Sequence, residues 1–143
     1  MKANSTNVTS VPVQTAPADF LDRMTVLEIK SERLTQEQQL RNIRAELEAL
    51  RLSRERWIPS TPELETLTIE LRKVNQELWD LEEVVRRCDA AEDFGEEFIR
   101  SARSIIHTNN RRAALKRAIN AQLGASFQEE KSYPLPDPTS AKT

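Results

Sequence analysis

The amino-acid sequence predicts an all-α fold: a long antiparallel helical hairpin with two shorter C-terminal helices packed on it, between extended or disordered ends. The chain has 143 residues, about one domain, with only 2 Gly and 5% aromatic residues but 31% charged residues. This composition favours helices over sandwiches and barrels. Residues 62–88 carry an apolar residue every three or four positions, and a proline-containing break at residues 57–62 separates this stretch from an earlier helical one.

The first predicted helix covers residues 20–54 and begins after a cap at Asp19. Its apolar positions fall into an early set and a late set: Leu21, Met24, Leu27 and Leu34, then Leu40, Ile43, Leu47 and Leu50. The spacing slips between Leu34 and Leu40, so we expect the helix to rotate or bend there. The segment 57–62 contains two prolines, which end the helical pattern and form the turn of the hairpin.

The second predicted helix, residues 62–88, has the clearest signal. Thr61 is its expected N-cap, and Pro62 suits the first helical position because an N–H there has no intrahelical partner. Apolar residues follow at alternating steps of three and four: Leu64, Leu67, Leu71, Val74, Leu78, Leu81, Val85 and Cys88. This unbroken seam predicts a helix that buries one narrow stripe against another helix, with Cys88 as a buried apolar residue. The sequence leaves open whether that other helix belongs to the same chain or to a second copy.

Two shorter helices are predicted at residues 94–107 and 110–123. The first begins with a capping-box pattern, Asp-x-x-Glu, that starts at Asp93. The polar stretch 108–110 interrupts the apolar face, and its asparagines favour the start of a new helix. Gly124 lies where a left-handed C-terminal cap is expected.

The predicted helical domain, residues 19–127, lies between a flexible N-terminal arm, residues 1–18, and an extended C-terminal tail, residues 128–143. The arm has three valines that could dock on another surface: Val8, Val11 and Val13. The beginning of the chain lacks the apolar stretch of a signal peptide. No segment approaches the roughly 18 apolar residues of a membrane-spanning helix. We therefore expect a cytoplasmic protein without a membrane span.

Charge is unevenly distributed, although the net charge is only −2. Residues 61–97 contain 4 basic and 12 acidic residues, whereas residues 98–131 contain 7 basic and 2 acidic residues. Two interpretations remain open. The acidic and basic segments neutralise each other by packing together, or the basic segment faces an anionic ligand. The near-neutral total disfavours nucleic acid as a partner.

The sequence contains no recognisable pattern for a cofactor or a catalytic set. Gly95 and Gly124 are the only glycines, so there is no glycine-rich phosphate loop. One His and one Cys leave no ligand set for a structural zinc, and the carboxylates of residues 82–97 lack the spacing of a metal site. We predict no cofactor and no metal site, and we favour a non-enzymatic protein.

Basic residues form a stripe on three of the predicted helices, and these stripes are the candidate binding residues. They are Arg23 and Lys30; Arg100, Arg103 and His107; and Arg112 and Lys116 with Asn120. If the stripes converge, they form a pocket for a phosphate or carboxylate, because arginine binds such groups through two parallel hydrogen bonds. If they diverge, they are solvated faces.

Glu28 follows the apolar stripe of the first helix and is the one candidate for a catalytic residue. Two roles remain open for it. In one, Glu28 pairs with an arginine such as Arg103 and fixes the helix packing. In the other, it is a general base beside a cationic pocket. His107, the only histidine, lies at the end of a predicted helix, where a capping or solvent role outweighs acid–base chemistry.

Four blocks of the sequence resemble a small bacterial family of uncharacterised all-helical proteins, a domain of unknown function. The blocks are LDRMTVLEIKSER at 21–33, VNQELWDLEE at 74–83, FIRSARSIIHTNNRRAALKRAIN at 98–120 and EEKSY at 129–133. The resemblance covers about residues 8–133 and implicates a set of positions: Asp22, Arg23, Thr25, Glu28, Lys30, Arg103, Asn109, Arg112, Lys116, Asn120, Glu130, Lys131 and Tyr133. This chain departs from the family pattern at Ala18, where the family tends to have Gly, and at Asn110, where it has Asp.

The resemblance implies an association with glycosyltransferases and surface-polysaccharide clusters. We therefore predict a small helical binding or adaptor protein in surface-glycan or lipopolysaccharide biosynthesis, with Lys131 as a further ligand-binding candidate. Its expected partner is a glycosyltransferase, another protein or an anionic small molecule. Two alternatives remain open: an enzyme acting on a phosphorylated sugar or nucleotide, and a structural coiled-coil homodimer without a ligand.

Overall fold

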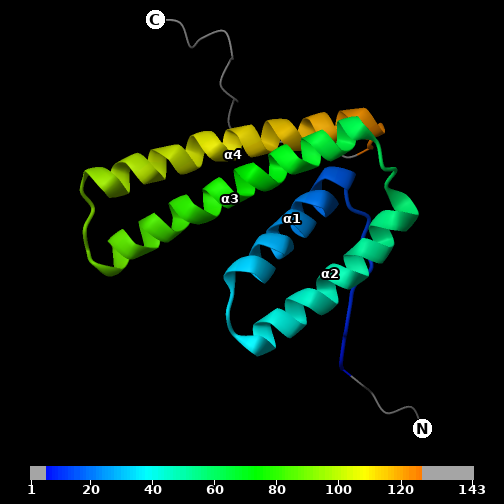
Figure 1. Cartoon of the computed structure of the whole chain (residues 1–143), viewed down its shortest axis with the longest axis horizontal. Coiled ribbons are helices and arrows are strands. Elements are labelled where there is room, and N and C mark those ends of the chain that lie inside the picture. Colours follow the sequence, from blue (N-terminus) through cyan, green and yellow to red (C-terminus); the bar gives the residue numbers. More distant parts are fainter. Residues whose placement is uncertain (1–5, 127–143) are drawn as a thin grey trace, which may run out of the picture.

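The computed structural model describes residues 6–126, which form four α-helices and no β-strand (Figure 1). In chain order the helices are α1 (Pro17–Arg33), α2 (Glu37–Trp57), α3 (Pro62–Ala90) and α4 (Glu96–Leu123). α3 and α4 form a long antiparallel hairpin, α1 packs against both of them, and α2 packs on α1. The all-α prediction is therefore confirmed. No described helix is both long and apolar enough to cross a membrane.

The prediction of one long helix over residues 20–54 is wrong, because the chain breaks at residues 34–36 into α1 and α2. Leu34 and Gln36 have an extended backbone there. Two apolar sets that are out of phase cannot face one neighbour along a single straight helix, so α2 folds back onto α1. The early and late sets then pack together: Met24, Leu27, Ile43 and Leu47. The predicted pairing of residues 20–54 with 62–88 is replaced by the α1–α2 and α3–α4 hairpins.

The two short helices predicted at 94–107 and 110–123 are also wrong, because α4 is continuous through this region. Asparagine lowers helix propensity by well under 1 kcal/mol, and packing overrides a penalty of that size. α4 has buried residues on both sides of the asparagines: Ser101 and Thr108 before them, then Ala113, Lys116, Ile119 and Asn120. The helix begins after Gly95, and the side chain of Asp93 accepts a hydrogen bond from the Gly95 N–H at 3.1 Å.

Local signals placed two helix ends correctly and two incorrectly, since the N-cap of α4 is Gly95 and not Asp93 of the predicted capping box. The Thr61 hydroxyl accepts a hydrogen bond from the Leu64 N–H at 3.2 Å, which confirms the predicted cap of α3. Gly124 ends α4 in the left-handed conformation with φ +63°, also as predicted. The N-cap of α1, however, is Ala16, so Asp19 lies inside the first turn and is not a cap.

The seam of α3 is covered within the chain. Leu64 and Leu71 are fully buried with Leu21 of α1 and Ile119 of α4. Cys88 is a buried free thiol, as predicted. α1 and α4 therefore cover most of this seam, while Leu67, Leu81 and Val85 stay half-buried.

The interpretation that the acidic and basic segments pack together is confirmed. α3 lies along α4, and ion pairs join the two helices. Arg111 of α4 donates to Glu77 of α3 at 2.9 Å, and the Thr108 hydroxyl lies 3.4 Å from the same carboxylate. A second pair, Arg87 of α3 with Glu97 of α4 at 2.8 Å, lies within the acidic segment itself. Of the basic residues of α4, Arg111 is therefore neutralised by α3, at the surface of the hairpin.

Candidate functional site

The predicted binding residues lie in three separate places. Arg23 and Lys30 are on α1, Arg100, Arg103 and His107 are on the outer face of α4, and Arg112, Lys116 and Asn120 face α1. Lys131, with Glu130 and Tyr133, lies outside the described residues. Arg103 and Lys116 are thirteen positions apart, which is about 20 Å along the helix axis. The basic stripes therefore do not meet in one small pocket.

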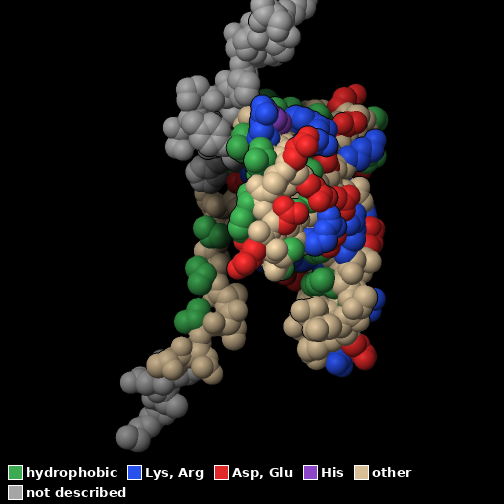
Figure 2. All heavy atoms as spheres, turned by 90° about the vertical axis from the view of Figure 1, so that its left-hand side faces the viewer, with side chains coloured by type: hydrophobic (Ala, Val, Ile, Leu, Met, Phe, Trp, Pro, Cys, Tyr) green, Lys and Arg blue, Asp and Glu red, His purple; other side chains and the backbone are tan. Residues whose placement is uncertain are grey.

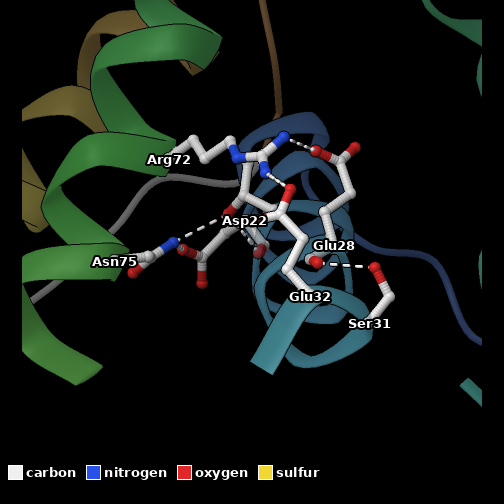
Figure 3. A network of polar contacts seen from close by, with 7 residues as sticks. Asp22, Glu28, Ser31, Glu32, Arg72 and Asn75 are labelled. Carbon is white, nitrogen blue, oxygen red and sulfur yellow. Dashed lines mark hydrogen bonds and ion pairs between the residues drawn. The ribbon is translucent and has the colours of Figure 1, made fainter. Parts of the chain in front are cut away.

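Asp22 of α1 is the centre of a buried network between α1, α3 and α4. Its Oδ1 accepts hydrogen bonds from Asn75 Nδ2 at 2.9 Å and from Arg112 Nε at 3.0 Å, and its Oδ2 accepts from Arg112 Nη2. The Asn75 amide also donates to the Thr25 hydroxyl at 2.8 Å, and that hydroxyl donates to the Asp22 carbonyl. Asp22 is only 7% exposed. Figure 3 shows Asn75 reaching from α3 to Asp22. The network fixes the three helices relative to one another.

A second polar set holds the start of α1 against the end of α4. Lys116 Nζ lies 2.7 Å from Asp19 Oδ1, and the Lys116 side chain is 11% exposed. The side-chain oxygen of Asn120 accepts a hydrogen bond from the Ala18 N–H at 2.9 Å. The first N–H groups of a helix have no intrahelical partner, and α1 has no side-chain cap of its own. Asn120 therefore supplies from α4 an acceptor that α1 lacks.

Two basic residues therefore lie at the α1–α4 interface, and both are engaged by carboxylates of this chain. Arg112 pairs with Asp22, and Lys116 pairs with Asp19, so each cation faces a carboxylate of α1. Removing one partner of a buried ion pair is strongly destabilising, because it leaves the other charge uncompensated. The two ion pairs at this interface therefore hold α1 against α4.

Glu28 pairs with Arg72 of α3, which corrects the expectation that its partner is Arg103 (Figure 3). Arg72 Nη1 donates to Glu28 Oε2 at 2.8 Å, and the same guanidinium pairs with Glu32 one turn further along α1. α1 lies beside α3 here, whereas Arg103 is on the outer face of α4. Glu28 is therefore tied between two helices and does not line the groove described below.

The remaining basic residues of α1 lie near its surface. Arg23 pairs with Glu46 of α2, and Lys30 is half-buried. Arg33 pairs with Asp80 of α3. The hydrogen bond to Asp80 raises the pKa of the Arg33 guanidinium above its already high ordinary value, so Arg33 stays charged at any physiological pH.

The outer face of α4 carries an open groove. It has a volume of about 350 Å³ and is lined by Glu96, Ile99, Arg100, Arg103, Ser104 and His107. Arg100 pairs with Glu96 within the helix, whereas Arg103 forms no ion pair or hydrogen bond with any residue of 6–126. Ile99 and Ile106 on the same side of the helix are 54% and 57% exposed. Figure 2 shows basic, acidic and apolar side chains mixed along the upper edge of this end of the molecule, over α4.

Metal binding has no donor set in the described part of the chain. Across residues 6–126, no three His, Cys, Asp or Glu side chains are grouped so that they could hold a metal ion. Several acidic residues of α3 instead pair with arginines, such as Glu82 with Arg86 and Glu77 with Arg111.

Fold and site together define an all-helical protein in which one set of polar residues locks the helices and another set lies open on α4. The chain belongs to a family of unknown function, DUF6165, whose family model matches residues 11–143. Neither the curated proteins nor the solved structures contain a match. The expected membership of a domain of unknown function is thereby confirmed.

Sequence reasoning from the residues alone missed the roles of Asp22 and Arg72. A signal for Asp22 was present, because Asp22 and Thr25 are next to Leu21 and Met24, on the side of α1 that becomes buried. A polar residue beside an apolar stripe needs a hydrogen-bond partner when it is buried. Asn75, which follows Val74 in the seam of α3, was the corresponding signal on the other helix.

Proposed function

We propose that this protein is a non-enzymatic adaptor that binds an acidic partner protein through the outer face of α4. The observation that carries the proposal is the position of Arg103, without a partner among the described residues, between the exposed side chains of Ile99 and Ile106. Protein interfaces are enriched in arginine and in apolar groups, and arginine is among the residues that contribute most to binding. Nothing in the rest of the described fold requires this face of α4 to carry such residues.

The charge of the groove supports an acidic partner. Two arginines, Arg100 and Arg103, line it with a single carboxylate, Glu96, which already pairs with Arg100. Complementary charge speeds association and suppresses wrong partners more than it adds affinity. A partner with a short acidic segment next to an apolar patch would match both the cations and the isoleucines.

The role in surface-glycan or lipopolysaccharide biosynthesis belongs to the same proposal. It is supported by the resemblance described above, which associates such proteins with glycosyltransferases. The enzyme alternative has less support, because Glu28 is engaged by Arg72 and lies away from the α4 groove.

Site-specific photocrosslinking in cells of the source organism tests the proposal. A benzophenone amino acid at position 99 should crosslink a protein that the same amino acid at position 52 does not. Leu52 is the matched control, because it is an exposed apolar residue on α2. The crosslink should be lost in Arg103→Glu and kept in Arg103→Lys, with helicity unchanged. A crosslink pattern that is the same at both positions, or that is insensitive to Arg103→Glu, would overturn the proposal. If the crosslinked protein is unrelated to glycan assembly, the glycan part of the proposal fails and the binding face remains.

A further inference from the structure

A larger groove lies at the other end of the molecule, where α1 begins and α2 and α4 end. Its volume is about 630 Å³. Twelve residues line it, among them Val13, Ala16, Phe20, Ser53, Trp57 and Ala125. None of them is charged, although charged residues make up 31% of the chain. We call this the end groove; its aromatic side chains, Phe20 and Trp57, suit an uncharged apolar occupant.

The N-terminal arm has the matching chemistry. Residues 6–15 precede α1 without helical structure, and every one of them is exposed. Val8, Val11 and Val13 are 75–82% exposed, and Figure 2 shows apolar side chains along an arm that stands away from the helices. Residues 3–18 contain no charged side chain. The chain therefore presents an uncharged segment with three exposed valines and an uncharged groove that this segment does not fill.

We propose that the arm of one copy occupies the end groove of a second copy, in a reciprocal arm-exchanged dimer. Each chain supplies both the arm and the groove, which is the self-complementary pairing that a twofold axis produces. The arm enters α1 beside the groove, so a twofold axis near the middle of the arm places the first half of each arm at the groove of the other chain. The extended backbones of the two arms can pair along their edges, and their valines then contact the partner's Phe20 and the partner's Trp57.

The arm is poorly placed to fill its own groove. Val13 and the three residues after it already form one wall, so Val8 and Val11 would need a sharp reversal of the chain to reach the inside. No glycine lies in residues 6–17 to permit such a reversal, and Pro12 fixes its own φ and restricts the residue before it.

The surface comes close to the size of a standard specific contact. The ten arm residues together with the nine other groove residues make nineteen residues on each chain. A standard protein–protein interface uses about 20–30 residues on each side. The extended arm rises about 3.3 Å per residue, so residues 6–13 span roughly 23 Å.

Sedimentation equilibrium of the full-length chain between about 1 and 200 µM tests the proposal. We expect a dimer for the wild type, and a dimer dissociation constant raised at least about 100-fold in Val8→Asp/Val11→Asp. The matched control is Leu52→Asp, which places an acid on an exposed apolar residue of α2 and should leave the dimer unchanged. A wild type that stays monomeric at 200 µM, or a double variant that dimerises like the wild type, would overturn the proposal.

A mixing experiment identifies the occupant of the groove. A chain with Val8→Cys and a chain with Ser53→Cys should form an intermolecular disulfide when mixed, and Cys88 is buried and does not compete. If a disulfide forms only when both cysteines are on one chain, the arm fills its own groove and the proposal is wrong. If removal of residues 127–143, and not of the arm, dissolves the dimer, the occupant is the C-terminal segment and the proposal is again wrong.

Discussion

Arg103 and Arg112 lie nine residues apart on α4, and their surroundings differ. Nine residues at 3.6 per turn place the two side chains on opposite faces of the helix. Arg112 faces α1, where Asp22 accepts two hydrogen bonds from its guanidinium. Arg103 lines an open groove between exposed isoleucines and has no partner among residues 6–126. The same residue type therefore serves the fold on one face of α4 and is available for binding on the other.

This contrast separates two roles that the sequence presents as one pattern. On the inner face, each basic side chain pairs with a carboxylate of α1. Removing one partner leaves the other buried without a hydrogen-bond or charge partner, which is unfavourable. On the outer face, removing Arg103 breaks no ion pair or hydrogen bond with residues 6–126, and Arg100 has only an exposed ion pair with Glu96 of the same helix. Variants of the inner face should change stability, and variants of the outer face should change binding alone.

The largest expected effect is that of Asp22→Ala. This change leaves Arg112 and Asn75 without the carboxylate that both contact, so we expect the free energy of unfolding to fall by about 3 kcal/mol. Urea denaturation followed by circular dichroism measures the change. Glu46→Ala is the control, because Glu46 pairs with Arg23 at the surface and its loss should cost at most about 1 kcal/mol. Equal destabilisation by the two variants would show that Asp22 does not lock the helices.

A smaller effect is expected for Asn120→Ala. The variant removes the acceptor for the Ala18 N–H, which lies at the buried start of α1, so we expect a loss of about 1–2 kcal/mol. Hydrogen exchange should show faster exchange of the Ala18 amide than of amides in the middle of α3. The matched control is Asn110→Ala in the same helix, because the buried Oδ1 of Asn110 accepts no hydrogen bond from the described part of the chain. That control should be neutral or slightly stabilising, since alanine is the better helix former. If both asparagine variants behave alike, Asn120 does not hold α1 in place.

The sequence predicted those features of the fold that local interactions decide. Thr61 and Gly124 are cap residues with a defined chemistry, and both were placed correctly. The break at residues 34–36 has neither Gly nor Pro, so only the phase of the apolar residues signalled it. The opposite error occurred at Asn109 and Asn110, where the sequence predicted a break and the helix is continuous. Packing against α3 keeps the helix intact through residues of modest propensity. Where a helix breaks in this chain depends on which neighbour can bury its apolar face.

Tertiary packing also decided which of the predicted site residues meet. Each basic stripe was visible from helical spacing, but whether two stripes meet depends on how each helix is rotated about its axis. Arg112 and Lys116 turn toward carboxylates of α1, and the sequence contains no signal that pairs them with Asp22 and Asp19 in particular. Glu28 had an arginine partner, as one interpretation required, but on α3 and not on α4.

The smallest expected effect on stability is that of Arg103→Ala. The side chain has no hydrogen bond or ion pair to lose within the described fold, and alanine is a good helix former, so the free energy of unfolding should change by less than about 0.5 kcal/mol. The same urea titration measures it beside Asp22→Ala. Binding through the outer face should nevertheless weaken, because arginine contributes strongly at interfaces. A loss of more than about 1 kcal/mol would mean that Arg103 supports the fold as Arg112 does, and the two faces of α4 would then no longer differ in role.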